Sequence, residues 1–275
     1  MKDVFISTAV RTPIGNFGGT LAAVRTDDLA AHVLRALMEK VPTLDPAAIE
    51  DIVMGCANQA GEDNRNVARM ASLLAGIPFS VPGETVNRLC ASGMSAILNA
   101  SRGLQSGNGD IAIAGGVENM TRGPWVISKA SGAFGRDQQM FDSSFGWRFI
   151  NPKMQELYGT DGMGETAENL VDLYKIEREA QDAFALWSQQ KAAKATANGI
   201  HAQEIAAVTI PQKKGDPLVF AADEFIKAST TMETLGKLRP AFRKDGSVTA
   251  GNASGLNDGA AAMLQIGRAS CRERV

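Results

Sequence analysis

The sequence has few of the residues that bind metals or form disulfide frameworks. Among its 275 residues are three cysteines, Cys56, Cys90 and Cys271, and two histidines, His32 and His201. The cysteines lie too far apart for a CxxC metal motif, and three are too few for the paired cysteines of small secreted domains. We therefore expect neither a metal site nor a disulfide-stabilised fold.

A basic excess and long apolar runs are also missing. Lys and Arg number 28 against 30 Asp and Glu, so the formal charge is −2, and no surplus of positive charge is present to bind nucleic acid or an anionic membrane. No apolar run approaches the roughly 18 residues of a membrane span, and the N-terminus, MKDVFISTAVRTP, lacks the layout of a secretory signal. We expect a cytoplasmic protein with neither nucleic acid nor membrane as a partner.

What the sequence does contain is typical of an α/β fold. Apolar residues make up 44% and charged residues 21%, as in ordinary globular domains. A strand is expected at 3–6, and Thr26 is expected to cap a helix whose polar side carries His32. Between residues 76 and 120 the order is turn, strand, helix, strand, and strands that alternate with helices predict parallel βαβ units. The helix in this stretch carries an apolar row at three-to-four spacing: Met94, Ile97, Leu98, Ser101 and Leu104.

The pattern changes along the chain and predicts four parts. Residues 1–120 are expected to form an N-terminal α/β core domain, and residues 121–248 an inserted loop domain with helices at 165–176 and 178–198. Residues 249–266 are expected to begin a C-terminal α/β domain. The tail at 267–275, GRASCRERV, interrupts a core element that has just begun, so we expect the chain to be a fragment.

Cys90 is the most informative single residue. VNRLC is expected to end a strand and CASGMSAIL to begin a helix, which places the sulfur at a helix N-terminus, where a thiolate is favoured. The unpaired amides of the first helical turn would face the oxyanion that forms when this thiolate attacks a carbonyl. On local spacing alone, a nucleophile and a small packed cysteine are equally supported.

The other cysteines and the histidines have weaker contexts. Cys56, in MGCANQ, is expected to be a packed residue, and Cys271 lies in the atypical tail and receives no role. His32 is expected on a wet helical face and His201 follows a helix stop, so neither is expected to be a catalytic base.

Four segments, in this order and at these separations, resemble the thiolase family: VNRLCASGMSAI, AGGVENM, MGETAENL and KLRPAFRKDGSVTAGNASGLNDGAAAM. The resemblance runs from residue 1 to about residue 265. It implies a layered α/β/α/β/α fold of which this chain holds the N-terminal half and the inserted loop domain, with the C-terminal half truncated. It also implies cleavage or condensation of 3-oxoacyl-CoA thioesters with Cys90 as the acylated nucleophile, coenzyme A as co-substrate without a permanently bound cofactor, and assembly as a homodimer or homotetramer.

The resemblance also suggests binding residues. Ser254 in GNASG and Phe242 in RPAF match family residues that touch coenzyme A, and Met163 in GMGETAEN matches one that lines the acyl channel. Biosynthetic members that handle acetoacetyl-CoA usually have His before that Met, whereas this sequence has Gly162. This difference argues against a strictly acetoacetyl substrate.

Two further segments, GCANQAGEDNRNVARM at 55–70 and GWRFINP at 146–152, look more like members that act on 3-oxoadipyl-CoA. The terminal carboxylate of such a substrate needs a cationic partner, and Arg148 is the first candidate and Lys227 the second. The alternative is that Arg148 ties down irregular backbone through carbonyl groups, and this structural role is the more favoured of the two.

Three family segments are missing from these 275 residues: Asn-Glu-Ala-Phe, Gly-His-Pro, which holds the base, and Cys-x-Gly-Gly, which holds the second catalytic cysteine. We therefore expect a thiolase-type acyltransferase acting on 3-oxoadipyl-CoA or a related 3-oxoacyl-CoA, with little or no turnover by this chain alone. The alternatives are a non-catalytic thiolase-like scaffold or CoA-binding protein, a fragment of a biosynthetic acetoacetyl-CoA thiolase, and a cysteine-dependent hydrolase.

Overall fold

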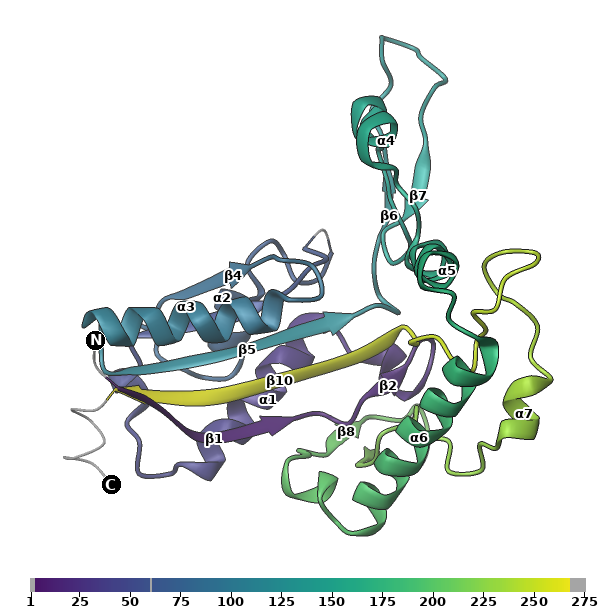
Figure 1. Cartoon of the computed structure of the whole chain (residues 1–275). Coiled ribbons are helices and arrows are strands. Elements are labelled where there is room, and N and C mark those ends of the chain that lie inside the picture. Colours follow the sequence, from purple (N-terminus) through teal and green to yellow (C-terminus); the bar gives the residue numbers. More distant parts are fainter. Residues whose placement is uncertain (1–2, 60, 268–275) are drawn as a thin grey trace. The chain divides into compact units, whose positions relative to one another are not determined.

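The computed structural model describes residues 3–59 and 61–267, which divide into two compact units (Figure 1). Unit 1 contains residues up to 123, 201–224 and those from 257 onward, and unit 2 contains 124–200 and 225–256. The chain thus leaves unit 1 twice and returns to it twice. Cys271 and all of the tail except Gly267 lie outside the described residues.

Unit 1 is a mixed sheet with helices on both faces. Its strands are β1 (Val4–Arg11), β2 (Gly15–Asn16), β3 (Asp51–Gly55), β4 (Gly83–Val86), β5 (Ile111–Asn119), β8 (Val208–Ile210), β9 (Leu218–Phe220) and β10 (Asn257–Gly267). Its α-helices are α1 (Thr26–Lys40), α2 (Val67–Leu74) and α3 (Ser92–Ser106), and short 3-10 turns lie at Thr20–Ala23, Pro46–Ala48 and His201–Gln203.

The strand order of the main sheet is β1-β10-β5-β3-β4, and β2 also pairs with β10. β3 is parallel to both β4 and β5, as expected for βαβ units. β10 is antiparallel to β1 and to β5, a mixed arrangement that the alternating pattern did not predict. Figure 1 shows β10, in yellow, between purple β1 and teal β5.

The two faces of this sheet carry different cores because side chains alternate along each strand. On one face, Ile52 and Met54 of β3 pack with the buried residues of α1 and α2. On the other face, Val53 packs with Ala96, Ala100 and other buried residues of α3. The expected α/β architecture therefore has its layers in the order helix, sheet, helix within unit 1.

One local expectation is wrong and another holds in part. Thr26 is the first residue of α1 rather than its cap; Arg25 holds the cap position, and the Thr26 amide donates to the Glu62 carboxylate at 3.2 Å. In α3, Leu104 of the expected row is buried, whereas Met94 is 65% exposed, and the buried face also carries Ala96 and Ala100. Small residues form the buried face because they allow the helix to lie close to the sheet.

Unit 2 is less regular and consists of a hairpin and helices. The hairpin pairs β6 (Trp125–Ile127) with β7 (Met140–Asp142). The helices are α4 (Pro152–Tyr158), α5 (Met163–Tyr174), α6 (Arg178–Ala197) and α7 (Met232–Gly236). The helices expected at 165–176 and 178–198 thus lie within two residues of α5 and α6.

The unit boundaries differ from the four expected parts. Residues 201–224, expected inside the inserted domain, belong to unit 1, where β8 and β9 pair with each other. Of residues 249–266, expected to begin a C-terminal α/β domain, those from 257 onward belong to β10, between β1 and β5 in the unit 1 sheet, and residues 249–256 belong to unit 2. Long-range antiparallel pairing of this kind has no local sequence signal, because the partner strands lie more than 100 residues away.

Candidate functional site

Cys90 lies on an exposed turn between β4 and α3 in unit 1. The strand ends at Val86, four residues before the cysteine and earlier than expected, and the helix begins at Ser92. Cys90 therefore directly precedes the helix cap Ala91, which provides no side-chain cap. The Ser92 amide, the first in α3, donates to the Leu89 carbonyl at 3.0 Å, so the first-turn amides available to an anionic group are those of Gly93 and Met94.

The turn that carries Cys90 has an unusual backbone. Leu89 has φ of +51°, a left-handed conformation that costs a residue with a side chain roughly 1–2 kcal/mol. Its side chain is 71% exposed, so packing does not offset this cost. Hydrogen bonds hold the turn instead: the Leu89 amide donates to Asn87 Oδ1 at 2.8 Å, and the Leu89 carbonyl accepts from the Ser92 hydroxyl at 2.6 Å and from the Ser92 amide at 3.0 Å.

The N-terminus of α3 lies against the end of β3. A Cβ atom at Gly55 would stand 2.4 Å from the backbone carbon of Ser92 and 2.5 Å from the Gly93 nitrogen. Backbone atoms cannot rotate away from such a contact. Glycine at position 55 therefore permits the close approach that fixes the start of α3 against the sheet.

A half-buried carboxylate supports the neighbouring loop. Glu118 of β5 accepts hydrogen bonds from the amides of Ala57 at 2.8 Å and Asn58 at 3.1 Å. The Ala57 carbonyl in turn accepts from Asn87 Nδ2 at 3.0 Å. Burial raises the pKa of Glu118 above its ordinary value, although the two amide donors favour its charged form, and the charge of Asp63 adds to the rise.

Cys56 has the packed environment that the sequence predicts. It is 1% exposed, and its thiol donates to the Asn58 carbonyl at 3.4 Å. Burial raises the pKa of the Cys56 thiol, and the charge of Glu118 raises it further, so this thiol stays protonated at neutral pH. Cys90 and Cys56 thus differ in access to solvent, one exposed and one buried.

The two histidines make polar contacts with other segments of unit 1. His32 Nε2 lies 3.3 Å from the Ala206 carbonyl, so its side of α1 is partly covered rather than fully wet as expected. His201 Nδ1 lies 3.7 Å from an Asp223 carboxylate oxygen. Arg11 donates two hydrogen bonds to the same carboxylate, at 2.7 and 3.0 Å.

Two of the expected binding residues of unit 2 lie together. Met163 is the first residue of α5 and is 80% exposed. The ring of Phe242 occupies the space beside the next residue, because a Cβ atom at Gly164 would meet it at 2.1 Å. The structure therefore places an exposed methionine next to a half-exposed aromatic ring.

Lys227 and Gly255, the residue that follows Ser254, both lie against a second ring, that of Phe225. A Cβ atom at Gly255 would meet the Phe225 ring at 2.4 Å, and Lys227 Nζ lies 5.6 Å from the centre of the same ring. Both Ser254 and Lys227 are exposed. Arg148, the remaining expected binding residue of unit 2, donates from Nη1 to the Ser143 carbonyl at 3.2 Å. A bond to a backbone carbonyl is what the structural role of Arg148 predicts.

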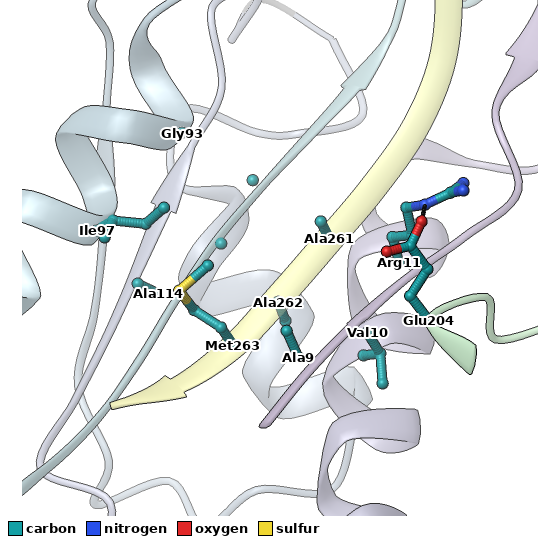
Figure 2. A pocket seen from close by; sticks show the side chains of 12 residues that line it. Ala9, Val10, Arg11, Gly93, Ile97, Ala114, Glu204, Ala261, Ala262 and Met263 are labelled. Carbon is teal, nitrogen blue, oxygen red and sulfur yellow. Dashed lines mark hydrogen bonds and ion pairs between the residues drawn. The ribbon is translucent and has the colours of Figure 1, made fainter. Parts of the chain in front are cut away.

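A hollow of about 310 Å³ lies on the α3 side of the unit 1 sheet. Figure 2 shows its lining of small and apolar side chains, with Ile97 on the helix and Ala114 and Met263 on the strands. The Arg11–Glu204 ion pair, 2.8 Å long, lies among its lining residues. Cys90 is not one of them.

Within the ranges 3–59 and 61–267, the structure contains no group of three or more His, Cys, Asp or Glu side chains suited to a metal ion. Over the same residues, the helices are too short or too polar to cross a bilayer.

Sequence reasoning missed three residues around Cys90: Asn87, Ser92 and Glu118. Asn87 and Ser92 do carry a local signal, since Asn and Ser side chains commonly bond backbone groups two or three residues away in turns. Glu118 carries none, because its partners lie about 60 residues earlier in the chain.

The chain is similar to known proteins over nearly all of its length. Residues 4–269 match the family model described as thiolase, N-terminal domain. The chain is 55% identical over 264 residues to the beta-ketoadipyl-CoA thiolase of Acinetobacter baylyi and 57% identical over 264 residues to that of Pseudomonas putida, covering 96% of this chain and 66% of each relative. It also resembles the crystal structure of the Bacillus anthracis acetyl-CoA acetyltransferase, with a TM-score of 0.86, 40% identity, and coverage of 99% of this chain and 67% of the other.

Proposed function

The chain belongs to the thiolase family, and from this premise we propose that it carries the acyl-accepting half of a thiolase reaction on 3-oxoadipyl-CoA or a related 3-oxoacyl-CoA. The observation that carries the proposal is the exposed Cys90 at the N-terminus of α3. The beta-ketoadipyl-CoA thiolases at 55–57% identity support the choice of substrate. The chain spans 66% of the length of these relatives.

The proposed step begins with attack of the Cys90 thiolate on the 3-oxo carbon. The bond between C2 and C3 then breaks, and its electron pair leaves as the enolate of acetyl-CoA, which takes up a proton. The remaining acyl group stays on the sulfur as a thioester until the thiol of a second CoA attacks it, releasing the shortened acyl-CoA and restoring Cys90. The amides at the start of α3 stabilise the negative oxygen that forms during the attack.

Coenzyme A serves as a co-substrate in this proposal and is not permanently bound. Met163 and Phe242 would contact the acyl and pantetheine portions, because a flexible thioether and an aromatic ring present apolar surface together. Ser254 and Lys227 would bind polar and phosphate groups. Lys227 lies over the Phe225 ring, and Gly255, which follows Ser254, lies against the same ring, which supports this part of the proposal.

Arg148 remains the candidate partner of a substrate carboxylate, with Lys227 second. Within the described part of the chain, the Arg148 guanidinium makes one hydrogen bond, to the Ser143 carbonyl, so donors remain for a second acceptor. In the same proposal the protein is cytoplasmic, forms a homodimer or homotetramer, and shows little turnover as this 275-residue chain.

Acylation of Cys90 tests the proposal without requiring turnover. The chain is incubated with 3-oxoadipyl-CoA and digested, and the peptide that holds Cys90 is examined by mass spectrometry. We expect a succinyl thioester on Cys90 and one equivalent of acetyl-CoA released, and neither in a Cys90→Ser variant. Binding of CoA with no acyl group on Cys90 would instead support a non-catalytic CoA-binding protein, and release of a free carboxylic acid would support a hydrolase.

The CoA-binding residues are tested by a pair of glycine variants at the start of α5. A Cβ atom at Gly164 displaces the Phe242 ring, whereas one at Gly162 meets nothing within 4 Å. Gly164→Ala should weaken CoA binding about fivefold, which corresponds to roughly 1 kcal/mol, and Gly162→Ala should leave it unchanged. Equal affinities measured by calorimetry would remove Phe242 from the proposed CoA contacts.

A further inference from the structure

The turn before α3 has a feature that the proposed chemistry does not account for. A left-handed leucine with an exposed side chain stands directly before the proposed nucleophile. Such a conformation persists only where surrounding groups over-determine it. Both backbone polar groups of Leu89 are held: its amide by Asn87 Oδ1 at 2.8 Å, and its carbonyl by the Ser92 hydroxyl at 2.6 Å and the Ser92 amide at 3.0 Å.

Ser92 closes the turn from the helix side. Its hydroxyl donates to the Leu89 carbonyl and also accepts from the Arg88 amide at 2.8 Å, so one oxygen joins both residues that precede the cysteine. Ser92 is 5% exposed, and its backbone lies against Gly55. The hydroxyl is therefore attached to a part of the backbone that has no room to shift.

Asn87 closes the turn from the strand side. Its Oδ1 accepts from the Leu89 amide, and its Nδ2 donates to the Ala57 carbonyl at 3.0 Å. The Ala57 amide is held by Glu118 of β5 at 2.8 Å. The amide group of Asn87 thus links the turn to the centre of the sheet, in the same unit.

From these contacts we infer that Asn87 and Ser92 are positioning residues for Cys90. They hold the left-handed turn at Leu89 that presents the cysteine sulfur at the first amides of α3. This inference rests on the proposed role of Cys90 as nucleophile. Neither side chain needs to contact the substrate.

The test measures the rate at which iodoacetamide alkylates Cys90 at pH 7, by mass spectrometry of the intact 275-residue chain and its peptides. In Ser92→Ala and Asn87→Ala the thiolate loses its alignment with the helix amides, and alkylation should slow at least about threefold. Ser72→Ala is the matched control, because Ser72 is also buried and also donates from its hydroxyl to the carbonyl three residues earlier, Arg69, at 2.9 Å. In this control variant, iodoacetamide should alkylate Cys90 at the same rate as in the parent chain.

A second substitution separates positioning from a general loss of stability. Asn tolerates the left-handed conformation better than Leu, and residue 89 is exposed, so Leu89→Asn should favour the turn without disturbing the core. Added to Ser92→Ala, it should bring the alkylation rate back to within about twofold of the parent. Thermal unfolding of each variant shows whether it is folded at the assay temperature.

The outcomes are distinct. Unchanged or faster alkylation in Ser92→Ala, an equal decrease in Ser72→Ala, or no recovery on adding Leu89→Asn would overturn the inference. If the parent chain reacts readily at Cys90 but the variants give one of these results, the nucleophile proposal stays intact. A parent chain that is alkylated by iodoacetamide yet never acylated by 3-oxoadipyl-CoA would contradict the proposed function and leave the positioning result standing.

Discussion

Replacement of Gly55 by Ala should destabilise unit 1 at the point where β3 meets α3. The added Cβ would lie 2.4 Å from the Ser92 backbone carbon, 2.5 Å from the Gly93 nitrogen and 2.7 Å from the Ser92 oxygen. All three are backbone atoms, so relief requires the helix to move from the sheet rather than a side chain to rotate. Overpacking of this kind costs about 1–3 kcal/mol, and the upper end applies where no side chain can yield.

Gly103→Ala provides the matched control. Gly103 lies within α3, is partly exposed, and has nothing within 4 Å of an added Cβ. The same chemical change should therefore stabilise the chain by about 0.5–1 kcal/mol, because alanine favours the helix.

Thermal and urea unfolding, followed by circular dichroism, measure both variants. At about 2–4 °C per kcal/mol, Gly55→Ala should unfold roughly 6–12 °C below the parent and Gly103→Ala slightly above it. Gly55→Ala should also slow the alkylation of Cys90, because the start of α3 moves. A Gly55→Ala variant as stable as the parent would refute the close approach on which the geometry of this site depends.

Three further outcomes are expected. Limiting iodoacetamide at neutral pH should label Cys90 well before Cys56, because burial raises the pKa of Cys56 and shields it; earlier labelling of Cys56 on peptide maps would exclude this ordering. The hydrogen bond from Arg122 lowers the pKa of Glu62, so Glu62→Gln should destabilise the chain by about 1–3 kcal/mol at pH 7, and the difference should shrink as pH falls through that lowered pKa; urea unfolding at pH 7 and pH 4 measures this, and a constant difference would refute it. If Arg148 binds a substrate carboxylate, Arg148→Met should weaken acylation by 3-oxoadipyl-CoA by about 2–5 kcal/mol and spare an uncharged 3-oxoacyl-CoA of similar length, whereas equal loss on both would make it structural.

The spacing of apolar residues predicted the helices whose buried side chains lie along one face. In α1, Leu29, Val33 and Leu34 are fully buried, as their spacing indicates, and α6 ends within a residue of its predicted limit. The failures share a different cause. The Thr26 amide is taken by Glu62, 36 residues later, and β10 pairs with strands from the start and middle of the chain. Partners so distant in sequence leave no pattern in a local window.

The candidate site likewise contains one residue that the sequence predicted and others that it did not. The proposed nucleophile, Cys90, could be chosen from its strand-to-helix context together with the family motif, whereas the groups that hold it could not. The signal for Glu118 is absent because its two amide partners belong to a loop 60 residues away. The lowered exposure of His32 likewise arises from a carbonyl of Ala206, which no pattern around residue 32 indicates.

An attacking thiol must be both exposed and fixed, and these two demands conflict. Exposure removes the packing contacts that fix most side chains, and Leu89 beside Cys90 is exposed as well. Directional contacts must then replace packing, which accounts for the hydrogen bonds of Asn87 and Ser92 to the turn and for the absence of a side chain at Gly55. The reactivity of Cys90 should therefore depend on Asn87, Ser92 and Gly55, which act through size and hydrogen bonding and take no part in the reaction itself. Substitutions at these three positions should lower the reactivity even where every group that touches the substrate is retained.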